Sequence, residues 1–269
     1  MRLASVATAA ALLITLRATA ATAHAADARE AIAVLRQRIE TADYRATGRL
    51  VQVDASGQRT NNSITIKARW FPGVLRTLVE IVPPVVAEGE AQQDARLSIL
   101  LETRPNGQNA IRIFHPHEPA PTRLPFDEWT RSIFGSDFSY EDFLEPAYFW
   151  PDQKIIKHAR FAGRDCDVLK STPGAADRTH YAEIQTWLDH TIIYPIYAEE
   201  TLKDGQGVKE FTYLGLTRSG GVWAARQVQA KIRGRAGSSL LILERGSTKA
   251  NLKMKDFSTE EISKFEDHP

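Results

Sequence analysis

Hydrophobic and polar residues alternate over most of the chain beyond residue 60. Residues 64–70 (ITIKARW) alternate strictly, and the same period of two recurs in six later runs: 97–101, 111–113, 184–188, 208–216, 222–232 and 240–243. This period is typical of β-strands with one buried face. Short turns that contain glycine separate the runs, as at Pro105-Asn106-Gly107. The pattern predicts a mainly β fold, an antiparallel meander of about ten strands in one domain.

One helical pattern precedes these strands. Asp27 and Glu30 fit a capping box, in which each side chain bonds to the backbone of the other residue. Ile32, Leu35 and Ile39 then recur at steps of three and four residues. We therefore expect one amphipathic helix from Asp27 to about Glu40, with its single apolar stripe covered by another element.

The meander is interrupted once, between Pro116 and Pro151. Repeated prolines favour irregular chain and short helices in this segment, which we call the aromatic insert (residues 116–151). Its large apolar and aromatic side chains are too numerous to face water together: Phe126, Trp129, Ile133, Phe134, Phe138, Tyr140, Phe143, Leu144, Tyr148, Phe149 and Trp150. We expect the insert to lie as a lid against the concave face of the sheet.

A twisted sheet of about ten strands either closes into a barrel or wraps partway around a filler. One helix and the insert are too small to fill the inner face of so large a sheet. We therefore expect an apolar cavity between the sheet and the lid. A fully packed core without a cavity is the alternative. The expected lining is Trp70, Ile99, Leu101 and Ile113 on the sheet, and Trp129, Phe134, Phe138, Phe143 and Trp150 on the lid.

The first 25 residues have the order of a secretory signal peptide. Met1-Arg2 is followed by an apolar run from Leu3 to Leu16 and by small residues that end at Ala25. The apolar run is shorter than the roughly 20 residues of a membrane-spanning helix. We expect cleavage after Ala25, which would leave residues 26–269 as a single exported domain, periplasmic in a Gram-negative host. An uncleaved membrane anchor is the alternative.

Charge and cysteine content exclude two classes of protein. The 269 residues carry 34 basic and 33 acidic side chains, a formal net charge of +1. A general nucleic-acid-binding protein needs a basic surplus, so we expect no nucleic acid as a partner. Cys166 is the only cysteine, which excludes a disulfide scaffold, and its place at the start of an alternating run favours a small buried strand residue.

Motifs for catalysis or metal binding are lacking. The chain has no Gly-x-Ser-x-Gly, His-Glu-x-x-His, phosphate-binding glycine loop or dinucleotide fingerprint. His115 and His117 would share one strand face, but no third and fourth metal ligands stand at a credible spacing. We expect neither an enzyme nor a bound metal or cofactor.

Four carboxylates of the insert, Asp137, Glu141, Asp142 and Glu145, could in principle form an acid–base pair. However, a serine followed by acidic residues, as at Ser139, is more typical of a helix N-terminus, where serine caps and acids complement the helix dipole. We expect structural capping here. A secreted hydrolase using Asp137 and Glu141 remains a rival hypothesis.

Several segments resemble one family. Residues 135–143 (GSDFSYEDF) resemble the GSDFSYED signature of the LolA-like outer-membrane lipoprotein-sorting proteins. Shorter stretches are similar as well: residues 163–171 (GRDCDVLKS), 187–189, 209–211, 246–252 and 256–258. The resemblance implies an incomplete antiparallel β-barrel wrapped around helices, with acyl chains bound in its hollow in the periplasm.

The resemblance also implies a latch and partners. In the lipoprotein carrier of that family a strand arginine bonds the closed lid; Arg45, Arg49 and Arg69 are the candidates here, and the sequence does not choose among them. We expect a monomer that binds lipid or lipoprotein acyl chains for transfer towards the outer membrane. An inner-membrane exporter or an outer-membrane receptor would be its partner. A lipid-sensing domain that signals to a membrane partner is the other rival hypothesis.

Overall fold

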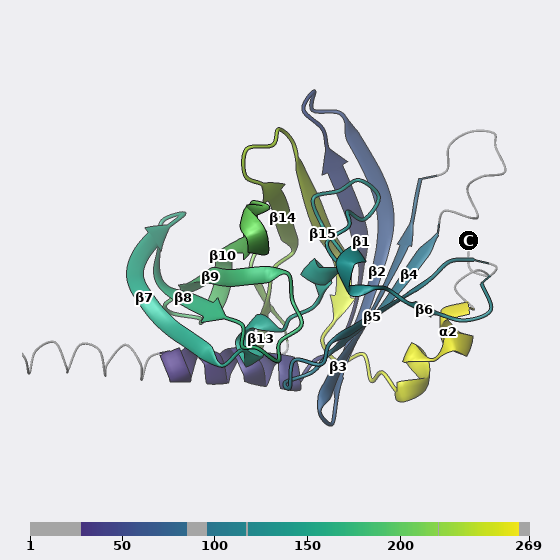
Figure 1. The fold of residues 1–269 in the computed structure, drawn as a ribbon, viewed down its shortest axis with the longest axis horizontal. Coiled ribbons are helices and arrows are strands. Elements are labelled where there is room, and N and C mark those ends of the chain that lie inside the picture. Colours follow the sequence, from purple (N-terminus) through teal and green to yellow (C-terminus); the bar gives the residue numbers. More distant parts are fainter. Residues whose placement is uncertain (1–27, 85–95, 117, 220, 264–269) are drawn as a thin grey trace, which may run out of the picture.

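The computed structural model describes residues 28–84, 96–116, 118–219 and 221–263 (Figure 1). Strands make up 52% of the structure. Six strands precede or lie within the insert: β1 (Asp43–Val53), β2 (Arg59–Phe71), β3 (Val74–Val82), β4 (Leu97–Thr103), β5 (Ala110–Phe114) and β6 (Thr122–Arg123). Those that follow are β7 (Asp152–Phe161), β8 (Arg164–Thr172), β9 (Tyr181–Asp189), β10 (Tyr194–Leu202), β11 (Val208–Leu214), β12 (Thr217–Ser219), β13 (Val222–Ala224), β14 (Gln227–Ile232) and β15 (Ser238–Ser247).

Thirteen of these strands form one antiparallel sheet in the described part of the chain. Their order is β6-β5-β4-β3-β2-β1-β15-β14-β11-β10-β9-β8-β7, and β12 pairs only with β13. The pairing of β1 with β15 joins the two halves of the sheet, while β6 and β7 stay apart as its edges. The expected mainly β, incomplete barrel is confirmed.

The number of strands exceeds the expected ten. The apolar run at residues 222–232 divides into β13 and β14, because the backbone N–H of Arg226 turns back to the carbonyls of Leu214 and Gly215. A two-residue strand, β6, also forms inside the insert. Periodicity alone does not locate such a break, since Val222, Trp223 and Val228 continue the apolar pattern across it.

The N-terminal helix (residues 28–40) is confirmed over its described length; Asp27, and with it the capping box, lies outside the described residues. Its apolar stripe of Ile32, Leu35 and Ile39 packs with Leu75 and other buried residues of β2, β3, β8 and β9. Figure 1 shows this helix, in purple, below β7 and β8 and extending towards β3. The helix therefore covers one end of the curved sheet and leaves the rest of the concave face to another element.

Strand β4 is buried along its whole length because both of its faces are covered. Ile99 and Leu101 face the aromatic insert, whereas Leu100 packs on the other face with Phe257 and Ile262 of the C-terminal segment. This segment contains a single 3-10 turn, η6 (Met254–Phe257), and the short helix α2 (Thr259–Ser263), drawn in yellow in Figure 1. The sheet thus lies between the insert and the C-terminal segment.

A β-bulge in β15 lies where the two halves of the sheet join, with Glu244 as the extra residue. The register between β1 and β15 shifts between Thr47 and Gly48. A Cβ atom at Gly48 would lie 1.8 Å from the carbonyl oxygen of Ile242, so this close approach requires glycine.

We predict that Gly48→Ala lowers the free energy of unfolding by roughly 1–3 kcal/mol, because the two backbones must separate to accept the methyl group. Urea unfolding measures the change. Gly246→Ala on β15 is the matched control, since its Cβ would have no neighbour closer than 3.3 Å. Equal midpoints for the two variants would contradict the proposed requirement for glycine at position 48.

Candidate functional site

The aromatic insert fills the concave face of the sheet. Trp129, Ile133 and Phe138 are 1%, 0% and 4% exposed and belong to the largest buried cluster. The ring of Phe138 lies 6.0 Å from that of Phe211 on β11, and Leu50 and Leu241 of the central strands belong to the same cluster. The insert therefore connects the two halves of the sheet through apolar contacts.

Seven of the nine expected lining residues come together in this cluster. Ile99, Leu101, Trp129 and Phe138 are buried in it, and Ile113, Phe134 and Phe143 pack against it. The structure places the other two elsewhere. Trp70 stacks on Phe149 at 6.1 Å beside the N-terminal helix, and Trp150 is buried with Tyr181 and Ile184.

The space that the sequence pattern assigned to a cavity is occupied by the insert's own side chains. A described cavity of about 420 Å³ lies instead at the edge of the insert, beside Phe126. Its lining includes charged and polar residues, among them Arg178, His180 and Lys203. The structure thus shows the insert packed on the concave face, with a separate polar pocket next to it.

A buried ion pair holds the insert to the sheet. Lys209 of β11 donates to Asp142 at 2.6 Å, and their side chains are 7% and 0% exposed. The same ammonium donates to the hydroxyl of Ser139 at 2.9 Å, and the hydroxyl of Tyr181 on β9 donates to Asp142. Charge-assisted bonds of this kind are among the stronger hydrogen bonds in proteins. Asp142 therefore fastens the insert to two strands at once.

Two further carboxylates of the insert are anchors as well. Glu141 accepts from the Thr179 hydroxyl at 2.6 Å, from the backbone N–H of His180 at 2.9 Å, and lies 2.8 Å from Nδ1 of the His180 ring. Asp137 donates its backbone N–H to the Ser239 hydroxyl at 2.8 Å and accepts from that hydroxyl at 2.9 Å. Gln52 of β1 adds a bond from its amide to the carbonyl of Gly135 at 2.6 Å.

The expected helix cap at Ser139 was wrong. The helix here is a single 3-10 turn, η3 (Glu141–Phe143), which begins after Tyr140 without a side-chain cap. Ser139 instead donates both its backbone N–H and its hydroxyl to Asp142, at 2.7 and 2.8 Å. The acids serve as acceptors for partners in the sheet and in the loop before β9, and these partners lie 38 to 102 residues away in sequence.

A fourth acid, on the sheet, lies beside the buried ion pair. Glu200 of β10 lies opposite Lys209 in the strand register. Burial, with a smaller contribution from the nearby Asp142 carboxylate, raises the pKa of Glu200 to about 8. Glu200 is therefore mostly protonated at pH 7, which leaves the Asp142 carboxylate as the charged partner of Lys209.

The three candidate latch arginines make other contacts. Arg49 pairs with Glu244 at 2.7 Å and Arg69 with Asp43 at 3.3 Å. Arg45 is exposed, and its charge acts on Glu80. These positions alternate with the buried residues Ala46, Leu50 and Ala68, so their side chains face away from the concave surface. The bonds to the insert come instead from residues such as Lys209 and Ser239, and from two arginines of the N-terminal helix. Arg36 donates to the carbonyl of Tyr148 at 2.6 Å, and Arg38 pairs with Glu145 at 3.5 Å.

Other candidate chemistry adds no site. Cys166 is buried in β8 as expected, and burial raises the pKa of its thiol. No group of three or more histidine, cysteine or acidic side chains in the described residues is arranged to hold a metal ion. None of the helices in the described ranges is long and apolar enough to cross a membrane. His117 and the expected signal peptide, residues 1–25, lie outside these ranges.

Comparisons place this geometry among known proteins. A family model described as "-like: Uncharacterized protein" matches residues 86–264, and no curated protein matches the chain. A solved outer-membrane lipoprotein-sorting protein domain of Vibrio parahaemolyticus superposes with a TM-score of 0.75 at 18% identity, over 89% of this chain and 99% of that one. A DUF1329 family protein of Desulfovibrio piger superposes with a TM-score of 0.73 at 16% identity, over 85% of this chain and 95% of that one. A LolA superfamily protein of Nitrosomonas europaea superposes with a TM-score of 0.64 at 13% identity, over 87% of this chain and 98% of that one.

We predict that Lys209→Met lowers the free energy of unfolding by roughly 3–5 kcal/mol, because it leaves the carboxylate of Asp142 buried without a cation. The double variant Lys209→Met/Asp142→Asn should recover at least half of this loss. Arg49→Met, which breaks an exposed ion pair, is the control and should cost less than about 1 kcal/mol. Equal losses for Lys209→Met and Arg49→Met in urea unfolding would refute the anchor.

The raised pKa of Glu200 predicts a pH dependence of stability. Between the usual value of 4.5 and about 8, the folded state binds more protons than the unfolded state, so the free energy of unfolding falls as the pH rises through this window. Glu200→Gln should flatten that slope and stabilise the protein above pH 8. Glu199→Gln, one residue away on the opposite face, should leave the slope unchanged. A slope that is the same in Glu200→Gln and wild type would contradict the assignment.

Proposed function

The chain belongs to the LolA-like family, and from that premise we propose that it is a non-enzymatic carrier of lipid acyl chains. The acyl chain would bind between the concave face of the sheet and the aromatic insert. The insert would leave the sheet to admit the chain and return when the chain is released.

The observation that carries this proposal is the construction of the insert. It supplies the concave face with buried apolar side chains such as Trp129 and Phe138, yet its own regular structure is limited to β6 and the single turns η2 (Phe126–Glu128), η3 and η4 (Ala147–Phe149). Its displacement would therefore break few backbone bonds of the sheet. The surface of the sheet that this displacement would expose is lined by Ile99, Leu101 and other aliphatic residues.

The energies are compatible with reversible binding. An acyl chain of about 16 carbons offers on the order of 12 kcal/mol of transfer free energy, at roughly 0.8 kcal/mol per buried methylene. A carrier that gained all of this would not release its cargo. Opening the lid exposes the insert's aromatic side chains and separates Asp142 from Lys209, which offsets much of the gain.

The same proposal includes a compartment and a route. The signal-like first 25 residues support export, cleavage after Ala25 and a mature periplasmic domain of residues 26–269. The similarity to an outer-membrane lipoprotein-sorting domain supports lipoproteins or other lipids as cargo for the outer membrane. An inner-membrane exporter or an outer-membrane receptor would then be the partner on either side of transfer.

A disulfide across the anchor tests the proposal. Asp137 of the insert and Ser239 of β15 are hydrogen-bonded side chains, so Asp137→Cys/Ser239→Cys in a Cys166→Ala background should lock the lid when oxidised. We predict at least a tenfold loss in affinity for a fluorescent fatty-acyl probe in the oxidised protein, and recovery after reduction. Binding is measured by probe fluorescence.

The matched control is a second disulfide that does not involve the insert. Ser63 and Val82 face each other across β2 and β3, and Ser63→Cys/Val82→Cys should bind the probe equally well when oxidised and when reduced. Full uptake of the probe by the oxidised Asp137→Cys/Ser239→Cys protein would contradict a lid that has to open.

A further inference from the structure

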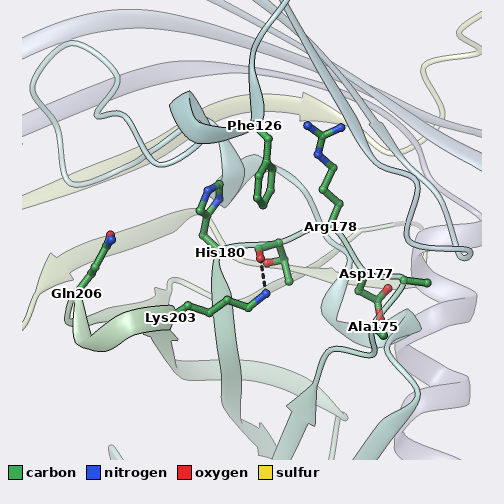
Figure 2. Close-up of a pocket in the computed structure, with 9 residues that line it drawn as sticks. Phe126, Ala175, Asp177, Arg178, His180, Lys203 and Gln206 are labelled. Atoms are coloured by element: carbon green, nitrogen blue, oxygen red, sulfur yellow. Dashed lines mark hydrogen bonds between the residues drawn. The ribbon is translucent and has the colours of Figure 1, made fainter.

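The pocket beside the insert has features that the lid does not explain. It measures about 420 Å³ and lies between the insert, the loop before β9 and the single turn η5 (Lys203–Gly205). Its lining is Phe126, Ala175, Ala176, Asp177, Arg178, Thr179, His180, Lys203 and Gln206. Figure 2 shows the ring of Phe126 between the side chains of His180 and Arg178, with Lys203 on the opposite side of the pocket.

Arg178 presents unused hydrogen-bond donors. Its guanidinium lies over the rings of Phe126 and Trp129, with centroids 4.8 and 5.3 Å away. These aromatic faces orient the guanidinium plane, but they accept none of its five N–H bonds. Among the contacts of the described residues, none gives those N–H groups an acceptor. The arrangement is suited to a planar or tetrahedral oxyanion.

Lys203 adds a second cation, and the acids nearby are already engaged. The ammonium of Lys203 donates one hydrogen bond, to the Thr179 carbonyl at 2.8 Å, which leaves two donors for a ligand. Asp177 is the acidic residue of the lining, and its Oδ2 accepts from the backbone N–H of Gly174 at 2.7 Å. Glu141 lies behind His180 and is held by Thr179 and His180. The lining thus favours an anion.

Phe126 forms the wall between this pocket and the apolar cluster. Its ring stacks on His180 at 3.9 Å and meets Trp129 edge-on at 5.1 Å, and it packs against the largest buried cluster. An amphiphile could therefore place its anionic group beside Arg178 and its chain beyond Phe126, where the insert now lies. A free anion would occupy the pocket alone.

We infer that this pocket binds a phosphate ester, the group shared by phospholipid headgroups and free glycerol phosphates. The inference deepens the proposed function and rests on it where the phosphate belongs to a lipid. Arg178 donates two hydrogen bonds to the phosphate oxygens, and Lys203 supplies a second positive charge. Phe126 lies at the boundary between the headgroup in the pocket and the acyl chain in the apolar cluster. The carrier would then select phospholipid-like cargo over neutral lipids.

The test compares three probes by calorimetry below micelle-forming concentrations. Palmitoyl lysophosphatidylglycerol carries both groups, 1-palmitoylglycerol carries only the chain, and glycerol 3-phosphate carries only the phosphate ester. The variant is Arg178→Gln/Lys203→Gln. The control is Lys231→Gln/Arg235→Gln, which removes the same charges from exposed positions in β14 and the turn after it, outside the pocket lining.

We expect the Arg178→Gln/Lys203→Gln variant to bind the lysophospholipid at least tenfold more weakly and to keep its affinity for 1-palmitoylglycerol within twofold. Arg178→Lys should recover part of the loss, and the control variant should change neither affinity. Equal losses for the two lipids, or no loss for either, would overturn the inference.

The glycerol 3-phosphate arm separates this inference from the proposed function. If the wild type binds neither lipid but binds glycerol 3-phosphate in an Arg178-dependent way, the carrier proposal fails and the phosphate-ester site stands with a free ester as its ligand. If none of the three probes binds the wild-type protein, both proposals fail.

Discussion

The concave face of a wide, open antiparallel sheet is apolar and has to be covered, and this constraint governs the rest of the structure. The N-terminal helix covers one end of the sheet through Leu35 and Ile39. The remaining face is covered by a segment with little regular structure, the aromatic insert. A cover of this kind completes the core of the sheet, and of its described residues only the short strand β6 is paired with the sheet.

A small set of buried polar contacts determines where the insert lies. Apolar packing is non-directional, whereas the bonds from Lys209 to Asp142 and from Thr179 to Glu141 fix one position and one orientation. Protonation of Glu200 removes one negative charge from the surroundings of Lys209 and Asp142, which limits the cost of burying these groups. The polar anchors thus specify the position of the insert, and its aromatic side chains contribute buried apolar surface.

The sequence predicted the elements better than their contacts. Alternation of the type found in Ile64-Thr65-Ile66 predicts a half-buried strand whichever strand is its partner. The many Phe and Trp residues of the insert predicted that the insert is buried. Trp70 and Trp150 have the same apolar character as Trp129, yet they pack in other clusters, because strand register and chain path decide the partner. The anchors were missed for a similar reason: Lys209 lies 67 residues from Asp142, and nothing local in either segment reports the pairing.

The central claim is that the insert is a displaceable cover, and hydrogen exchange of its backbone amides during acyl-chain binding tests this most directly. The informative amides are those of Ile133, Asp137 and Glu141, which are hydrogen-bonded in the closed state to Phe138, Ser239 and Trp129. On addition of palmitoyl lysophosphatidylglycerol these amides should exchange faster, while the amides of β2 and β3 keep their rates. Protection of the insert that stays equal to that of β2 and β3, with and without the lipid, would contradict the account.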